Sequence, residues 1–192
     1  TLQPAAPAVP LGGTPPAAAN PAQAEPEGQQ AAVQAAKRYF VPFTELVLAG
    51  EYSQRSWSIF LTPEQAAART EIHLGYQSAI VVAPEASRMT LSVNGTQVVD
   101  EPIAGSDNVA DIVATIPSRV LHAGLNEISI SAVQRHRTDC SIPSTYELWT
   151  QIDLSRTFLS FDSADAGRWK RVEDMRAIGV DESGATTFNL IV

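Results

Sequence analysis

Residues 88–103 read RMTLSVNGTQVVDEPI, and this stretch predicts a β-hairpin. Apolar and polar residues alternate on both sides of the Asn94-Gly95 pair, as they do in strands that bury one face. Asn and Gly both tolerate the positive φ that the two central residues of a type I′ turn require. We therefore expect residues 88–93 and 96–103 to be antiparallel neighbours in a sheet.

Short apolar and β-branched runs separated by turn-forming residues continue from Phe43 to the end of the chain. This pattern is typical of an all-β sandwich or barrel. The expected strands are Phe43–Ala49, Trp57–Leu61, Thr70–Tyr76, Arg88–Val93, Thr96–Ile103, Asp111–Ile116, Asn126–Val133, Tyr146–Ile152, Phe158–Phe161 and Thr186–Val192.

Three segments between expected strands suggest helices or turns. Gln65 follows Thr62 by three residues, which predicts a capping box and a short helix through the following alanines. Residues 116–124 begin with Ile-Pro and end in Gly, which predicts a single helical turn. Residues 165–177 mix charged and apolar residues in a way that predicts a short helix or a surface loop.

The beginning of the chain has a different composition from the rest. Seven of the 13 prolines lie in the first 26 residues, with alanine filling most of the gaps. Such a segment cannot bury enough apolar surface to offset its ordering entropy, so we interpret it as a flexible tether. Residues 31–38 are expected to add a turn of helix at its end. The expected division is a Pro/Ala-rich tether (1–38), a β-sandwich domain (39–162) and a connector with the first strand of a following domain (163–192).

Charge and cysteine content exclude some functions. The chain has 13 Lys and Arg against 21 Asp and Glu, a net charge of -8, which disfavours nucleic-acid binding because that affinity depends on clustered cations. Cys140 is the single cysteine and has no partner for a disulfide within the chain. A nucleophilic pairing with His136 does not fit protease signatures, so we expect a structural or disulfide role for Cys140.

Other catalytic and metal-binding patterns are weak. The common metal, nucleotide and hydrolase motifs are not present in the sequence, so neither a cofactor nor a metal is expected. Two alternatives stay open. Glu147 and Asp153 are candidates for the paired carboxylates of a glycoside hydrolase, although a solvent-facing role is favoured. Asp107, Asn108 and Asp111 are candidates for a calcium site of oxygen ligands.

The three tryptophans are the most informative aromatic residues, since sugar rings stack on aromatic faces while their hydroxyls seek polar side chains. Trp57 and Trp149 fall inside expected strands, where burial in a core is favoured. Trp169 lies among Arg168, Lys170 and Arg171 outside the strand pattern. It is therefore a candidate for contact with a sugar or a neighbouring domain.

Two segments carry a family resemblance. Residues 134–140 read QRHRTDC and residues 146–153 read YELWTQID, and together they strongly resemble the B subunit of bacterial cellulose synthase. Residues 87–95, SRMTLSVNG, resemble a hairpin of the same family, and the Ile-Pro and Gly-Leu-Asn of residues 116–126 agree with it in order. The resemblance covers residues 43–192.

The resemblance implies a jelly-roll β-sandwich of the galactose-binding-like, carbohydrate-binding type, without enzyme activity. It implies a periplasmic domain that guides the nascent β-1,4-glucan and supports the catalytic subunit of cellulose synthase in biofilm-forming bacteria. The full-length family alternates such domains with flavodoxin-like ones and is anchored to the inner membrane by a C-terminal helix. Members have also carried the label cyclic-di-GMP-binding, which an acidic periplasmic domain does not favour.

Candidate glucan contacts follow from these considerations. They are Trp169, His136, Arg137 and Tyr146, chosen as aromatic, cationic or hydrogen-bonding side chains in or near the resembling segments. Two other functions remain open at this point. One is a sugar-binding accessory module of a secreted glycoside hydrolase, and the other is a purely structural domain that docks on sibling subunits and touches no sugar.

Overall fold

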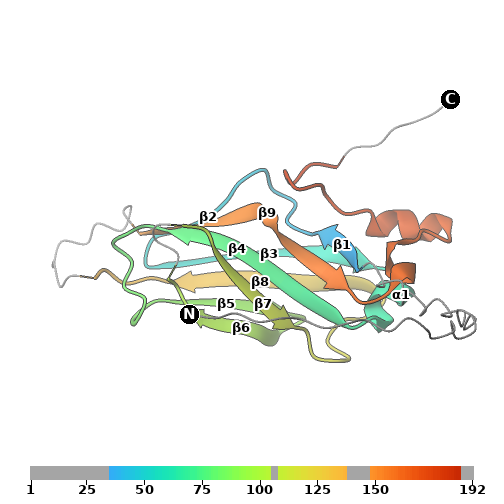
Figure 1. Ribbon diagram of the computed structural model, residues 1–192, viewed down its shortest axis with the longest axis horizontal. Helices are drawn as coiled ribbons and strands as arrows, with labels where there is room; N and C mark the ends of the chain where they lie inside the picture. Colours follow the sequence, from blue (N-terminus) through green and yellow to red (C-terminus); the bar gives the residue numbers. More distant parts are fainter. Residues whose placement is uncertain (1–34, 105–107, 138–147, 187–192) are drawn as a thin grey trace, which may run out of the picture. The chain divides into compact units, whose positions relative to one another are not determined.

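Two antiparallel sheets face one another in the computed structural model, which describes residues 35–104, 108–137 and 148–186 (Figure 1). Their arrangement confirms the predicted all-β sandwich. Sheet A contains β1 (Ala36–Tyr39), β9 (Trp149–Phe161), β4 (Thr70–Ser78) and β7 (Ala110–Thr115) in that order, and β2 (Leu46–Ala49) also pairs with β9. Sheet B contains β3 (Tyr52–Leu61), β8 (Gly124–Val133), β5 (Arg88–Val93) and β6 (Thr96–Pro102) in that order.

The predicted hairpin is confirmed. β5 and β6 are antiparallel, with Val93 opposite Thr96. Asn94 and Gly95 have φ of 49° and 76°, as a type I′ turn requires. The Asn94 side chain also donates to the carbonyl oxygen of Val120 at 2.7 Å and accepts from the Glu127 N–H at 2.8 Å. The turn is therefore fixed by its backbone conformation and by side-chain bonds to neighbouring segments.

The core lies between the sheets and follows the alternation of each strand. Inward residues of β4, β5, β8 and β9 are almost fully buried, and the intervening residues point to solvent. Trp57 and Trp149 are half-buried and pack against this core, so their predicted core position is confirmed in part. Large side chains buried in the core include Leu48, Leu61, Ile72, Leu74, Met89, Leu91, Ile128, Ile130, Leu159 and Phe161.

The short helix α1 (Pro63–Ala67) confirms the predicted capping box. The Thr62 hydroxyl accepts from the Gln65 N–H, and the Gln65 side chain accepts from the Thr62 N–H, both at 3.1 Å. The helical turn predicted within residues 116–124 is wrong. The chain forms a hydrogen-bonded turn there, closed by the Val120 N–H on the Pro117 carbonyl at 3.2 Å, and Gly124 begins β8 instead of ending a helix.

Several strand and helix limits differ from the sequence prediction. β1 occupies part of the range predicted as tether and helical turn, because its backbone pairs with β9 from Ala36 to Tyr39. β3 begins at Tyr52 instead of Trp57, since edge pairing to β8 accommodates the polar Gln54-Arg55-Ser56 segment. The predicted strands 146–152 and 158–161 merge into β9 over the described residues, and Thr186 is not in a strand.

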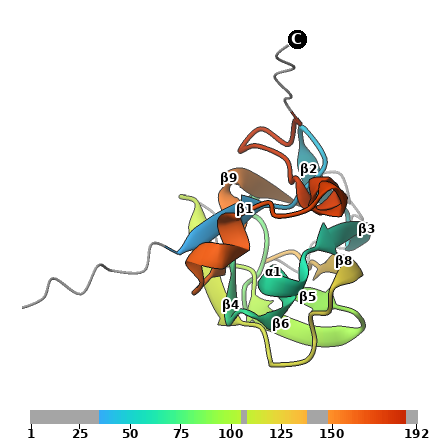
Figure 2. The ribbon, with the colours of Figure 1, turned by 90° about the vertical axis from the view of Figure 1, so that its right-hand side faces the viewer.

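After β9 the chain forms two 3₁₀ helices, η2 (Ala164–Gly167) and η3 (Val172–Ala177), where a short helix or a loop was predicted. Figure 2 views the molecule from the end that carries α1. At this end Gln65 donates to the Ala166 carbonyl at 3.0 Å, and Lys170 Nζ lies 3.7 Å from Glu64 Oε1. No helix in the described ranges is long and apolar enough to cross a membrane.

Candidate functional site

A row of ring-bearing side chains crosses the outer face of sheet A. Tyr39 in β1 lies opposite Phe158 in β9, and Phe158 lies opposite His73 in β4. We call these three residues the ring row. Their strand neighbours Ile72 and Leu159 point into the core, so the alternation of the strands places the ring row on the solvent side.

Contacts within the ring row hold its central ring in place. The rings of Phe158 and His73 are stacked at 4.3 Å between centroids and 14° between planes. Lys37 Nζ lies over the Phe158 ring at 3.7 Å, and the Tyr39 ring meets Phe158 edge-on at 5.9 Å. The two faces of Phe158 are therefore taken by His73 and Lys37. The Tyr39 ring is partly exposed and provides the remaining aromatic surface of the ring row.

A wide bulge in β9 follows the ring row. Phe158 pairs with His73 and Asp153 pairs with Gly75, so residues 154–157 bulge out opposite Leu74. The Thr157 hydroxyl donates to the Asp153 carbonyl at 2.7 Å and accepts from the Gly75 N–H at 3.2 Å. These bonds satisfy backbone groups that the interrupted ladder would otherwise leave unpaired. Bulges of this kind redirect side chains and are frequent next to functional sites.

The bulge sends Arg156 across β4 to the far strand of the sheet. Its guanidinium makes two bonds to the Asp111 carboxylate in β7, through Nε at 2.8 Å and through NH2. Gly75 lies beneath, and a Cβ there would be 2.5 Å from the Cβ of Arg156. The hydrogen bond to Asp111 raises the pKa of Arg156 above its ordinary value, so the cation is held firmly charged. The pairing also occupies Asp111, one of the predicted calcium ligands.

Beyond the bulge the same face contains a polar cleft of about 390 Å³. Gln77 in β4 and Gln151 in β9 lie opposite one another in its floor. Their amides have no hydrogen-bond partner among the residues that the structure describes. Further polar side chains complete the lining, and we call the whole set the polar cleft: Thr44, Glu45, Gln77, Gln151, Asp153, Ser155, Glu182 and Ser183.

One of the two candidate carboxylates of a glycoside hydrolase lies on this face. Asp153, a candidate carboxylate, accepts from the N–H and hydroxyl of Ser155 at 3.0 and 2.6 Å and so closes a local turn. Within the described ranges no cluster of three or more His, Cys, Asp or Glu side chains is arranged to hold a metal ion. Partly exposed rings, a fixed guanidinium and unpaired amides on one sheet face are side chains of the kinds that bind polyhydroxylated rings.

The outer face of sheet B is composed differently. Its hydroxyl and amide side chains bond one another across the strands: Ser129 accepts from Gln54 at 2.9 Å and pairs with Ser56 at 3.0 Å. Thr90 pairs with Ser131 at 2.7 Å. Tyr52 is 63% exposed at the start of β3, and its hydroxyl donates to Gln54. Phe60, at the other end of β3 on the same side, is partly buried and lies under Arg176. Most polar groups of this face are therefore already used within the sheet.

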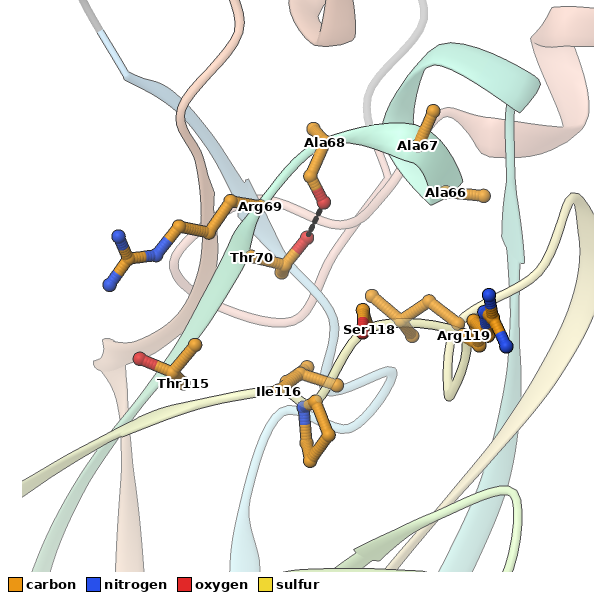
Figure 3. A pocket seen from close by; sticks show the side chains of 11 residues that line it. Ala66, Ala67, Ala68, Arg69, Thr70, Thr115, Ile116, Ser118 and Arg119 are labelled. Carbon is orange, nitrogen blue, oxygen red and sulfur yellow. Dashed lines mark hydrogen bonds between the residues drawn. The ribbon is translucent and has the colours of Figure 1, made fainter.

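A second cavity lies at the α1 end of the sandwich. It has a volume of about 660 Å³ and is lined by small and apolar side chains, including Ala66 to Ala68 and Ile116. Figure 3 shows Arg69 and Arg119 on opposite sides of it. Its lining includes no aromatic side chain. This cavity therefore lacks the stacking surface that the ring row provides.

Trp169, a predicted glucan contact, is 49% exposed. It lines a cavity of about 320 Å³ between β1, η2 and the segment after η3. Arg38 lines the same cavity and donates to the Phe60 carbonyl at 2.6 Å and to Gln65 Oε1 at 3.1 Å. Burial lowers the pKa of Arg38 to about 10. These bonds join β1 to the end of β3 and to α1, which gives Arg38 a structural role at this seam.

The other predicted contacts lie at the opposite end of the molecule. His136 forms a bridge with Val82, and the Arg137 side chain donates to the Val82 carbonyl at 3.0 Å. β3 pairs with β8 over ten residues, from Tyr52–Val133 to Leu61–Gly124, which separates the two ends by about 30 Å at ~3.4 Å per residue. Trp169 and His136 therefore do not form one site. Tyr146, Cys140, Glu147 and Asp107 lie outside the described residues.

The residues of the ring row were missed because no local motif marks them. Strand alternation was the available signal: His73 stands between inward Ile72 and Leu74, and Phe158 stands next to inward Leu159. Alternation alone does not say which strands are neighbours. It therefore could not bring Tyr39 beside Phe158, which is 119 residues later in the sequence.

Comparison with protein families identifies the chain. The family model described as "Cellulose synthase BcsB, first CBM domain" matches residues 29–165. The chain belongs to this family. The match agrees with the resemblance seen in the sequence, and it spans every strand of both sheets, including β1 and the ring row. A comparison with curated proteins found no match.

Solved structures with a similar fold include modules of carbohydrate-active proteins. The C-terminal CBM6 of LamC, a marine laminarinase from Zobellia galactanivorans, is 12% identical with a TM-score of 0.37, over 67% of this chain and 88% of that chain. A carbohydrate-binding module CBM36 in complex with calcium and xylotriose is 16% identical with a TM-score of 0.34, over 60% and 77%. TmCBM61 in complex with beta-1,4-galactotriose is 12% identical with a TM-score of 0.39, over 66% and 81%.

Proposed function

We propose that this domain binds the β-1,4-glucan made by cellulose synthase and guides it, with the outer face of sheet A as the contact surface. The observation that carries the proposal is the ring row, in which Tyr39, Phe158 and His73 lie in register on three adjacent strands. Membership in the BcsB CBM family supports cellulose as the ligand. The domain has no catalytic role in this proposal.

The Tyr39 ring offers a flat apolar surface for the C–H face of a glucosyl ring. Lys37 Nζ lies 5.8 Å from the centroid of that ring, within reach of the hydroxyls of a sugar stacked on it. Phe158 is held in place by stacking on His73, and its ring in turn packs edge-on against Tyr39. The surface is thus ordered before a ligand arrives, which reduces the entropy lost on binding.

A domain that guides the polymer must release it as the polymer advances, so its affinity for the glucan should be weak. We expect a Kd of about 0.1–1 mM for cellohexaose, equivalent to about -5.5 to -4 kcal/mol. The open face agrees with this range, because a ligand lying on a sheet buries only one side. We place this function in the periplasm, beside the catalytic subunit of cellulose synthase and anchored with it to the inner membrane.

Two tyrosines on opposite faces give a matched test. Replacing Tyr39 with Ala should weaken cellohexaose binding about tenfold, the effect of losing ~1.4 kcal/mol of ring contact. Y39F keeps the ring and should bind like the unmodified protein. Y52A removes the exposed tyrosine of sheet B and should have no effect. Affinity is measured by calorimetric titration of each purified variant.

If Y52A loses cellohexaose binding and Y39A retains it, the ligand binds sheet B and not sheet A, and the proposal is overturned. Absence of any binding by the unmodified protein at millimolar cellohexaose would instead favour a purely structural docking domain. Release of shorter sugars from cellohexaose would contradict the non-catalytic role.

A further inference from the structure

The ring row and the polar cleft lie on one continuous face of sheet A. Along β4, the outward positions run from His73 through Gly75 to Gln77, with one residue facing the core between each pair. His73 is part of the ring row, and Gln77 lies in the floor of the polar cleft. The two regions are separated by four residues of strand, or about 14 Å at ~3.4 Å per residue. A single pyranose ring is too short to touch both.

Arg156 lies between the ring row and the polar cleft. The β9 bulge lifts it from the strand, and Asp111 fixes its Nε and NH2 atoms. Its NH1 group has no partner in the part of the chain that the structure describes. The side chain is 49% exposed, so the free N–H donors face solvent above Gly75. A guanidinium fixed on one side and free on the other is a pre-ordered donor for hydroxyl and ring oxygens.

We infer that the ring row, Arg156 and the polar cleft form a single track for an extended β-1,4-glucan, in which Arg156 hydrogen-bonds the chain midway. This inference rests on the proposed function. It adds the length of glucan that is bound and names Arg156 as a residue that contacts the middle of the glucan. Tyr39 stacks one glucosyl ring, Arg156 donates to the next part of the chain, and the amides of Gln77 and Gln151 bond its far end. Asp111 acts as a positioning residue for Arg156.

The track predicts that affinity depends on glucan length. Cellobiose reaches the ring row and not the polar cleft, whereas cellohexaose spans both. Cellohexaose should therefore bind about tenfold more tightly than cellobiose, as one additional charge-assisted hydrogen bond would provide.

A second ion pair on sheet B supplies the control. Arg88 and Asp100 are bonded at 2.6 Å, with side-chain exposure of 53% and 40%, close to the 49% and 45% of Arg156 and Asp111. R156Q should lower cellohexaose affinity several-fold and leave cellobiose affinity unchanged, so that the difference between the two affinities narrows. R88Q should change neither. Q151A, at the far end of the track, should weaken cellohexaose binding alone.

Calorimetric titration of both sugars distinguishes this inference from the proposed function. If R156Q and Q151A bind both sugars like R88Q, or if the unmodified protein does not distinguish the two lengths, the track is overturned. In that case the proposed function still stands provided that Y39A weakens both sugars. If Y39A has no effect either, both fail together.

Discussion

The two outer faces of the sandwich both present polar strand residues but use them differently. On sheet B, the hydroxyl groups of Ser129, Ser131 and Thr90 form hydrogen bonds with neighbouring side chains. On sheet A, the facing amides of Gln77 and Gln151 have no partner among the described residues, and the stacked rings of His73 and Phe158 lie further along the same two strands. A hydroxyl that is already paired offers a ligand little, because binding must first break the existing bond.

The same contrast applies to the two ion pairs. Arg88 and Asp100 lie on adjacent strands and make a local cross-strand pair. Arg156 and Asp111 are separated by β4, and their contact requires both a bulge in β9 and a glycine in β4. A contact that depends on two unusual backbone features is more specialised than an ordinary surface pair, whose stabilising effect is small.

Crowding at Gly75 should produce the largest effect on stability. G75A brings a Cβ to 2.5 Å from that of Arg156 and should lower the free energy of unfolding by about 1–3 kcal/mol through overpacking. Urea denaturation of G75A, R156G and the double variant measures the coupling between the two positions. We expect the double variant to be more stable than the sum of the single changes predicts.

Gly95 supplies the control for this coupling. It has φ of 76°, and a Cβ added there would have no atom within 4 Å, so G95A is destabilising through backbone strain alone. R156G should not alter the cost of G95A. Equal coupling for both glycines would mean that Gly75 is not required by the crossing arginine.

A smaller effect is expected for the hydroxyl pairs of sheet B. T90V leaves the Ser131 hydroxyl without its bond at 2.7 Å and should cost about 1 kcal/mol of unfolding free energy. Cellohexaose affinity should stay unchanged. Ser92 makes no side-chain hydrogen bond to the described residues, so S92A should stay within about 0.5 kcal/mol. A loss of sugar binding in T90V without a loss of stability would show that sheet B, and not sheet A, contacts the ligand.

Local sequence signals predicted the fold well. The Asn94-Gly95 turn and the Thr62–Gln65 capping box each depend on a few adjacent residues, and both are confirmed. The errors arose where pairing over long sequence distances decides the structure. Nothing local marks Ala36–Tyr39 as a strand, since it is stabilised by β9, and nothing local reveals that the Leu154–Thr157 segment is a bulge and not a break.

The candidate site was harder to predict for the same reason. Residues chosen for their chemical type, Trp169, His136 and Arg137, lie at opposite ends of the sandwich. The residues that do converge come from β1, β4, β7 and β9, and their grouping follows from strand order alone. Strand order is a property of the whole topology, so a reading of single segments misses it.

The most direct test of glucan binding on sheet A is an NMR titration of the ¹⁵N-labelled protein with cellohexaose. If sheet A binds the glucan, the largest amide shifts fall in β9 and β4, around Phe158, His73 and Gln151, and those of β5 and β8 stay unchanged. Shifts confined to sheet B, to the His136–Arg137 segment or to the α1 end would contradict it.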